Sequence, residues 1–481
     1  MLKNFITNLI KILVNLIFPL ITFPYISRIL LPEGIGRITY VQSINNYFLL
    51  FINLGIPLYG IREIAKVRNN RLEKSKVFSE VFFLNVITTI LGVIFYLYFY
   101  NLNIIKNDKE IFLIFSLVLL FNFLSVDWFF QGIEDYKYIT IRTVIIKILS
   151  TLFLFVFVKK SSDIYIYSII VVFSLVGSNF FNIVRALKLV QLKLKGLNIK
   201  RHLKGIFIIF SMNLAISIYT NLDSVMLGSY GSKYSLGIYS AATKIIVLVM
   251  GIVTSLGAVL LPRLSNYIEE KKEEEIKQIL EKTFSFLLFL IIPSIIGIYF
   301  TANEIILLLA GKEYLEATTT LKILSLIILF IGFSNFIGMQ ILYPRGEEKK
   351  VFYSVLVGAI TNFSLNLYLI PKYYQNGAAF ATCVAEFTVV VIQIFLGYKY
   401  LKFQKFNYNN FKFLVASFIM GGVLYFIQNL NINLNLLLKL ILKVSIGSSS
   451  YILLLILLRE DNIHEFLKKI LIKFRRKNEK I

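Results

Sequence analysis

The sequence predicts an all-α membrane protein with about 14 transmembrane helices, and two observations carry this prediction. The 481 residues are 57% hydrophobic and only 16% charged, with a mean hydropathy of +0.75, whereas soluble domains contain about 25% charged residues. Apolar runs also recur about every 30 residues, and each approaches the roughly 20 residues that a spanning helix needs. This spacing leaves no room for a soluble domain.

Each apolar run of spanning length is expected to form one helix, in the following order. The first eight runs are 6–31, 38–60, 79–100, 110–131, 139–158, 164–186, 205–229 and 237–262. The last six are 283–301, 318–343, 351–370, 376–398, 412–430 and 436–458. The run at 305–309 is too short to span and is expected at the membrane interface.

Lysine and arginine set the orientation, because the cytoplasmic loops of membrane proteins carry an excess of them. With both termini inside, the inner loops would hold about 33 basic residues and the outer loops about 8. Both termini are therefore expected in the cytoplasm. The net charge of +24 then reflects basic loops that face anionic lipid, and no nucleic-acid partner is expected.

The chain also repeats itself at an offset of about 200 residues, which corresponds to six helices. The second helix ends at Pro57 and the eighth at Pro262, and a charged loop follows each proline. An even number of helices makes the repeats parallel, related by a pseudo-twofold axis along the membrane normal. We expect an N-lobe of helices 1–6 (1–204), a C-lobe of helices 7–12 (205–400), two further helices (401–458) and a basic cytoplasmic tail (459–481).

The residue types present argue against several function classes. One cysteine, Cys383, and two histidines, His202 and His464, argue against a disulfide framework and a metal site. The sequence has no GxxxxGK[ST] motif and no recognisable nucleophile–base pair. No catalytic residue, metal or other cofactor is predicted, and coupling to H⁺ or Na⁺ stays open.

Several sequence blocks together resemble a known family. They are Ser27–Gly36, Asn53–Pro57, Ile61–Ala65, Asp127–Asp135 around Trp128, Asn221–Gly228 and Gly377–Thr382. In this order they are similar to the polysaccharide transporters (Wzx-type oligosaccharide flippases) of the MOP superfamily, which also contains the MATE drug antiporters and the lipid II flippase.

This resemblance implies two six-helix bundles around a central cavity that works by alternating access in the bacterial plasma (inner) membrane. The implied substrate is an undecaprenyl-diphosphate-linked oligosaccharide for O-antigen, capsule or similar surface polysaccharide. Membrane lipids, a polysaccharide polymerase and a chain-length regulator are the other partners that it implies.

Basic residues inside spans are costly and therefore are candidates for binding the diphosphate. Lys147 lies on a polar stripe of the fifth helix, and Lys244 lies in the eighth, where Asp223 would be its partner. Arg28 either contacts phosphate through its guanidinium fork or extends to the interface. Arg142 is a further cavity cation, although its position favours extension toward the cytoplasmic surface.

The role of each acidic or neutral polar residue in the spans has two possible interpretations. Asp127, Glu386 and Asp223 are candidates for a coupling ion, but Asp127 could instead pair with Arg142 or Lys137. The polar residues expected at the cavity are Asn46, Asn53, Ser217, Asn221 and Thr382. These side chains suit hydrogen bonds between helices as well as they suit sugar hydroxyls.

Three rival functions remain to be weighed against a flippase. A MATE-type cation or drug antiporter would place mainly acidic residues in its cavity, whereas basic residues at least match them here. A membrane polymerase or glycosyltransferase would need a large outer loop with catalytic residues, and no outer loop exceeds about 20 residues under the predicted topology. A passive lipid-binding scaffold is the third rival.

Overall fold

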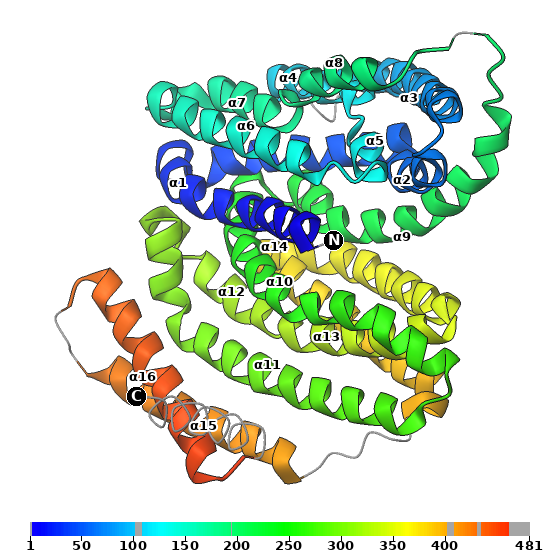
Figure 1. The fold of residues 1–481 in the computed structure, drawn as a ribbon. Helices are drawn as coiled ribbons and strands as arrows, with labels where there is room; N and C mark the ends of the chain where they lie inside the picture. The colour runs from blue at the N-terminus through cyan, green and yellow to red at the C-terminus, as the bar shows by residue number, and fades with distance from the viewer. Residues whose placement is uncertain (1, 102–107, 194, 402–407, 431–433, 461–481) are drawn as a thin grey trace, which may run out of the picture. The chain divides into compact units, whose positions relative to one another are not determined.

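The computed structural model describes residues 2–101, 108–193, 195–401, 408–430 and 434–460. Within these ranges, the side chains at 2–13, 15–17, 212, 213, 215–219, 256, 258, 259 and 408 are not described. All regular structure in the described ranges is helical, with no strand (Figure 1). The expected all-α class is therefore confirmed.

The chain forms two compact units, which are described separately. Unit 1 consists of residues 1–240 and 366–378, and unit 2 consists of residues 241–365 and 379–481. The lobe bounds at 1–204 and 205–400 remain predictions. Two long helices contribute to both units, because α10 (Lys233–Glu269) passes from unit 1 to unit 2 and α14 (Glu348–Leu401) contains residues of each.

The remaining helices of unit 1 occupy its first 230 residues. They are α1 (Leu2–Asn53), α2 (Ile56–Val67), α3 (Arg71–Tyr100), α4 (Lys109–Leu120), η2 (Asn122–Leu124), α5 (Asp127–Gly132), α6 (Tyr136–Phe157), η3 (Ser161–Asp163), α7 (Ile164–Val176), α8 (Asn179–Leu189) and α9 (Lys200–Tyr230).

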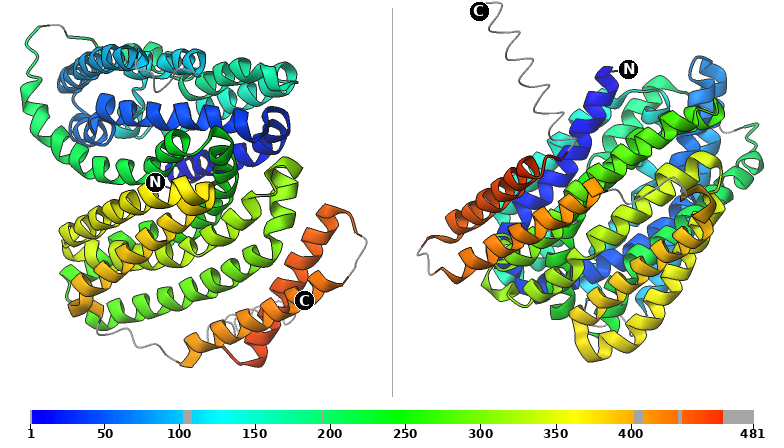
Figure 2. Two further views of the ribbon diagram at one scale, coloured as in Figure 1. Left: turned by 180° about the vertical axis from the view of Figure 1, so that it is seen from behind. Right: turned by 90° about the horizontal axis from the view of Figure 1, so that it is seen from below.

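Unit 2 continues from α10 through helices of more varied geometry. They are α11 (Glu273–Leu309), η4 (Lys312–Tyr314), α12 (Ala317–Ser325), α13 (Ile327–Asn335), the π-helical η5 (Phe336–Leu342), η6 (Tyr343–Arg345), α15 (Tyr408–Asn429) and α16 (Leu436–Leu457). Figure 2 shows α15 and α16, in orange and red, beside α11.

Eleven helical segments of the described residues are long and apolar enough to span a membrane. Two of these segments, 18–67 and 348–401, each contain two of the expected spans joined at a bend or a short turn. The expected seventh span coincides with α9. The chain is thus a multi-pass membrane protein. Of the three expected spans that are not counted separately, two are lost where neighbouring helices run on without a loop, and the third is α9, which is not among the eleven segments.

The bend in α1 has a local cause in the sequence. Leu31 has φ 59° and ψ 173°, so it leaves the helical region immediately before Pro32. A proline ring disfavours helical backbone in the preceding residue and supplies no N–H of its own. The 52-residue helix therefore divides into two parts at Leu31.

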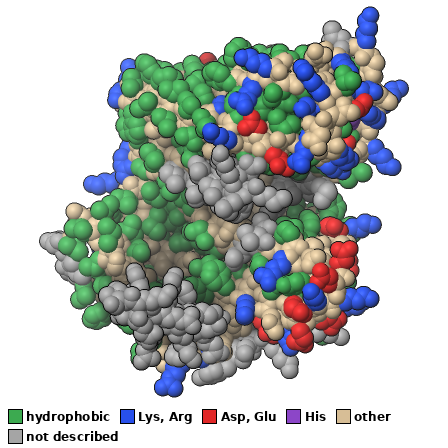
Figure 3. Space-filling view, viewed as in Figure 1, with side chains coloured by type: hydrophobic (Ala, Val, Ile, Leu, Met, Phe, Trp, Pro, Cys, Tyr) green, Lys and Arg blue, Asp and Glu red, His purple; other side chains and the backbone are tan. Residues whose placement is uncertain are grey.

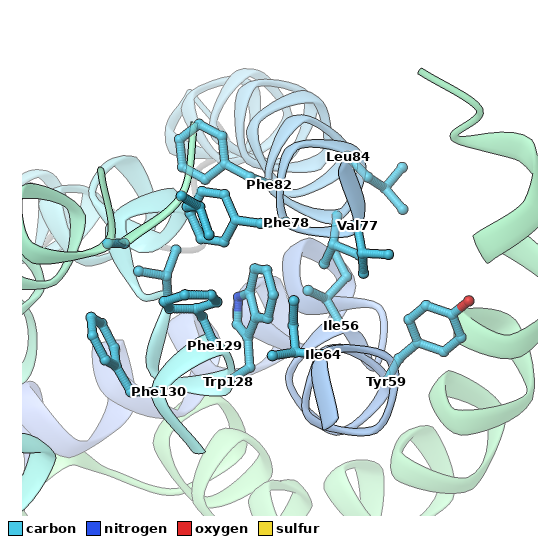
Figure 4. Packing of buried hydrophobic residues seen from close by; sticks show 14 of the residues in the cluster. Ile56, Tyr59, Ile64, Val77, Phe78, Phe82, Leu84, Trp128, Phe129 and Phe130 are labelled. Atoms are coloured by element: carbon cyan, nitrogen blue, oxygen red, sulfur yellow. The ribbon is translucent and has the colours of Figure 1, made fainter. Parts of the chain in front are cut away.

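An aromatic cluster forms the core of unit 1 and explains the motif around Trp128 (Figure 4). Trp128 is 2% exposed and stacks on Phe78 of α3, with ring centroids 5.5 Å apart. Gly60 of α2 lies against the indole, because a Cβ there would be 2.6 Å from the Trp128 ring. Phe129 and Phe130 are also buried. The motif thus joins α2, α3 and α5.

The surface of each unit suits a lipid environment. Large apolar side chains such as Phe395 (80% exposed) and Leu457 (76% exposed) point outward. Figure 3 shows broad hydrophobic areas on both units, with most charged side chains toward the helix ends drawn at the right. An apolar belt between charged ends matches the apolar interior and polar surfaces of a bilayer.

Candidate functional site

Unit 1 contains a cavity of about 400 Å³ that is lined by an unusual number of amide side chains. Its polar lining comes from α1, η2, the residue after η2, and α8. These side chains are Gln42, Asn45, Asn46, Asn53, Asn122, Ser125 and Asn179. We refer to it as the asparagine pocket. Two of the residues expected at a cavity, Asn46 and Asn53, line it.

Hydrogen bonds fix several of these amides in place. The Asn122 amide donates to Asn53 Oδ1 at 3.0 Å, and Asn45 donates to the carbonyl of Phe115 at 2.9 Å. Asn46 donates to Asn221 Oδ1 at 3.1 Å, so a third expected residue contacts the lining. An amide carries both donors and acceptors, as does a sugar hydroxyl. The pocket can therefore exchange hydrogen bonds with a polyhydroxylated ligand.

A partly buried ion pair lies one helical turn from the pocket along α8. Arg142 of α6 donates to Asp127 Oδ1 at 2.7 Å and to the Ser178 carbonyl at 3.1 Å. Asn182, three residues after the pocket residue Asn179, also donates to Asp127 Oδ1 at 2.7 Å. Arg142 is only 7% exposed, so it does not extend to the surface, and the pairing considered for Asp127 is the one found.

The other expected cations of unit 1 lie elsewhere in it. Lys147 of α6 is half-buried and donates to Ser174 Oγ of α7 at 2.9 Å, with its ammonium 4.4 Å from the centre of the Phe18 ring. Within the described part of the chain, no carboxylate lies at ion-pair distance from Lys147. Arg28 is exposed and donates to the Pro24 carbonyl of its own helix.

Asp223 is buried in unit 1 and is held by two neutral donors. The Tyr239 hydroxyl donates to Asp223 Oδ2 at 2.8 Å, and the Asn366 amide donates to Oδ1 at 2.6 Å. Asn366 is completely buried, so α14 contributes to this site of unit 1. Lys244, expected as a partner of Asp223, belongs to unit 2, and that pairing remains a prediction.

The expected residues of unit 2 lie on α10 and α14. Lys244 is half-buried, and Glu386 is 7% exposed. Thr382 accepts a hydrogen bond from Asn362 at 3.5 Å. The side chain of Ser217, in α9, lies outside the described residues. The roles expected for these four residues remain predictions.

Two polar clusters of unit 1 were not anticipated from the sequence. In the first, Arg37 Nε donates to Asp108 Oδ1 at 2.6 Å, and Lys233 Nζ lies 3.8 Å from the same carboxylate. Arg37 lies within α1, Asp108 immediately precedes α4 and Lys233 begins α10, so no spacing in the sequence links them. Gly36 allows the close approach, because a Cβ there would lie 1.7 Å from the Lys233 carbonyl oxygen.

The second unanticipated cluster holds the connection between α8 and α9 against α3. The completely buried Glu80 accepts from His202 Nε2 at 2.8 Å, from Arg201, and from the backbone N–H of Asn198 at 2.8 Å. Ser75 and Ser79 accept from further N–H groups of the connection, those of Gln191 and Lys193. A glutamate inside an apolar run is the signal that could have found this cluster.

Among the described residues, no group of three or more His, Cys, Asp or Glu side chains is arranged to hold a metal ion. The arrangement in unit 1 combines neutral amides, a neutralised ion pair and the cation Lys147. The amides of the asparagine pocket can hydrogen-bond hydroxyl groups, and Lys147, which lies outside the pocket lining, can attract an anion.

Comparison with known proteins defines the family. The family model described as "Polysaccharide biosynthesis protein" matches residues 1–268, more than half of the chain. The chain belongs to this family. A second family model, MatE, matches residues 208–368 of this polysaccharide biosynthesis protein.

Two curated relatives align with most of the chain. CapF of Staphylococcus aureus, a capsular polysaccharide biosynthesis protein, is 29% identical over 413 residues, which is 83% of this chain and 99% of CapF. A candidate O-antigen transporter of Escherichia coli (strain K12) is 25% identical over 395 residues, 79% of this chain and 92% of that protein.

Two solved transporter structures share the fold of this chain. The lipid II flippase MurJ in an inward closed conformation matches with a TM-score of 0.69 at 20% identity, covering 91% of this chain and 98% of MurJ. An inward-facing MATE multidrug transporter matches with a TM-score of 0.66 at 12% identity, covering 79% and 93% of the two chains. The expected two-lobe MOP fold is thus confirmed.

Proposed function

We propose that this polysaccharide biosynthesis protein is a flippase, which moves a lipid-linked oligosaccharide from the cytoplasmic to the outer leaflet of a bacterial plasma membrane. The observation that carries the proposal is the asparagine pocket, a hydrophilic cavity inside an apolar helical unit. The functions named for CapF and the E. coli relative support a role in capsule or O-antigen assembly.

The physical task of a flippase explains why such a pocket is useful. A glycan headgroup cannot enter hydrocarbon without losing its hydrogen bonds to water, at a cost of several kcal/mol for each polar group. Fixed amides replace those hydrogen bonds, while the polyprenyl tail stays in lipid. Transport then needs alternating access and no covalent chemistry, so the proposed activity is not enzymatic.

Lys147 is the proposed contact for the diphosphate of undecaprenyl-diphosphate. Among the described residues, its ammonium contacts Ser174 Oγ and the Phe18 ring, whereas the charge of Arg142 is already compensated by Asp127. A partly buried cation without a carboxylate favours an anionic ligand. Arg28 and Lys244 are further proposed contacts, and Glu386 and Asp223 are proposed sites for a coupling H⁺ or Na⁺.

We also propose that both termini lie in the cytoplasm, on the basis of the lysine and arginine distribution. A polysaccharide polymerase and a chain-length regulator are the proposed protein partners, because they would consume the flipped oligosaccharide in the outer leaflet.

The decisive experiment is flipping of a labelled undecaprenyl-diphosphate-linked oligosaccharide in proteoliposomes of the purified protein. The proposal expects the labelled glycan to become accessible to an external modifying enzyme faster than in protein-free liposomes. The MatE match at 208–368 favours cation export as the second candidate. Export of a cationic dye without glycan flipping would therefore overturn the proposal and favour an antiporter.

A further inference from the structure

Unit 2 contains a second cavity of about 390 Å³, and its lining residues differ in type from those of the asparagine pocket. It is bounded by the end of α10, the start of α11, η6 and the end of α14. Its lining consists of Ile268, Lys271, Glu273, Ile276, Lys277, Leu280, Arg345, Lys399 and Tyr400. Figure 3 shows charged side chains gathered at the end of unit 2 where α10 passes into α11. We refer to this cavity as the basic pocket.

The four cations of the basic pocket are not matched by carboxylates. Among the described residues, Lys271, Lys277, Arg345 and Lys399 form no ion pair. The adjacent lysines outside the lining are paired, because Lys272 lies 2.6 Å from Glu270 and Lys350 lies 3.0 Å from Glu347. Glu273 is the one carboxylate of the lining, so the cations of the lining outnumber its carboxylates.

Neighbouring contacts hold the cationic rim in position. The Tyr400 hydroxyl donates to Glu347 at 2.6 Å, and the Arg345 guanidinium lies 5.2 Å from the centre of the Tyr400 ring. The hydrogen bond from Tyr400 and the charge of Lys350 lower the pKa of Glu347 below its ordinary value. Glu347 therefore stays ionised and keeps its contacts to Tyr400 and Lys350.

The rest of the lining includes apolar side chains. Ile276 and Leu280 of α11 are buried and lie one turn apart, and Ile268 of α10 completes the apolar lining. The volume is more than ten times the roughly 30 Å³ that one water molecule occupies in the liquid, so a phosphate group fits. A lining that combines cations with apolar side chains complements a ligand that carries a phosphate next to hydrocarbon.

We propose that the basic pocket binds the phosphate of an anionic phospholipid as a resident ligand in the cytoplasmic leaflet. All of its cations lie in segments that the lysine and arginine distribution assigns to the cytoplasmic side. Basic pockets between transmembrane helices on this side are suited to anionic lipid headgroups. This ligand is distinct from the transported oligosaccharide, so the site goes beyond the proposed flippase activity.

Lipid binding to the full-length protein in neutral detergent tests the proposal without any transport assay. Phosphatidylglycerol and phosphatidylcholine are titrated and the bound lipid is counted by native mass spectrometry. The double variant Lys277→Gln/Arg345→Gln should weaken phosphatidylglycerol binding roughly 30-fold, since each cation near a lipid headgroup contributes about fivefold. The charge-preserving Lys277→Arg/Arg345→Lys variant should bind within about threefold of the parent protein.

The matched control is Lys282→Gln/Lys349→Gln, which removes the same charge from exposed residues of the same segments that do not line the pocket. This control variant should bind phosphatidylglycerol within about twofold of the parent protein. An equal loss of phosphatidylglycerol binding in this control, or equal binding of phosphatidylcholine to the parent protein, would overturn the proposed lipid site. Inorganic phosphate could stabilise the protein against unfolding while phosphatidylglycerol binds no better than phosphatidylcholine. In that case the ligand is a soluble anion and the lipid assignment is wrong. Monodisperse elution and unchanged helicity confirm that each variant is folded.

Discussion

Removing Asp127 should destabilise unit 1 mainly by leaving Arg142 buried without its partner. Arg142 is 7% exposed, and its contact to Asp127 is 2.7 Å long. Breaking one side of such a buried pair costs about 3–5 kcal/mol, because the remaining charge is desolvated and uncompensated. Asp127→Ala should therefore lower the free energy of unfolding by about this amount, measured by denaturant titration of the purified protein in detergent.

The double variant separates a structural pair from a transport site. Asp127→Leu/Arg142→Met removes both charges, and replacing both partners with apolar residues is often neutral or stabilising. Most of the lost stability should return, and flipping in proteoliposomes should proceed at a rate close to that of the parent protein. A double variant that is stable but inactive would refute a purely structural role of the pair and would indicate that Asp127 takes part in transport. So would a stability loss below about 1 kcal/mol in Asp127→Ala.

Four further outcomes are expected. Lys147→Ala should weaken binding of the lipid-linked oligosaccharide by about 1.5–3 kcal/mol in a titration, whereas Lys147→Arg should keep most of it. Trp128→Ala should cost about 3–5 kcal/mol of stability in denaturant unfolding, since it empties a buried aromatic site. Gly36→Ala should reduce the yield of folded protein on size exclusion, because its methyl group would overlap the Lys233 carbonyl. The pKa of Glu347 is depressed, so its contribution to stability is present above the ordinary glutamate pKa and is lost as the pH falls through the folded value. Glu347→Gln should therefore flatten the acid side of the thermal-stability profile.

Hydropathy predicted the membrane helices well, because bilayer thickness imposes one length on every span. Apart from α9, which is not among the counted segments, the two places where the count differs from the expectation are physical continuations. One is the bend at Leu31 and the nearby turn before α2, and the other is Tyr374 within α14, with φ 48°. A hydropathy pattern divides two spans wherever the apolar run is interrupted. At a sharp bend the apolar run is interrupted although no loop separates the two helical parts.

Side-chain pairing was predicted only where the partners were close in the sequence. Asp127 and Arg142 are 15 residues apart on neighbouring helices, and their pairing was one of two readings considered. Arg37 and Asp108 are 71 residues apart, and nothing in a single sequence brings such residues together. Asn122 and Asn179 of the asparagine pocket were missed although each interrupts or borders an apolar run, a signal that applies as well to structural amides.

The contacts of the α8–α9 connection affect where this protein can be cut or extended. Its backbone N–H groups at Gln191, Lys193 and Asn198 are bound by side chains of α3. A protease must draw several consecutive residues into an extended strand, which would break these hydrogen bonds. This segment is rich in lysine, yet trypsin should cleave it slowly. An epitope tag inserted here would disrupt the contacts with α3 as well.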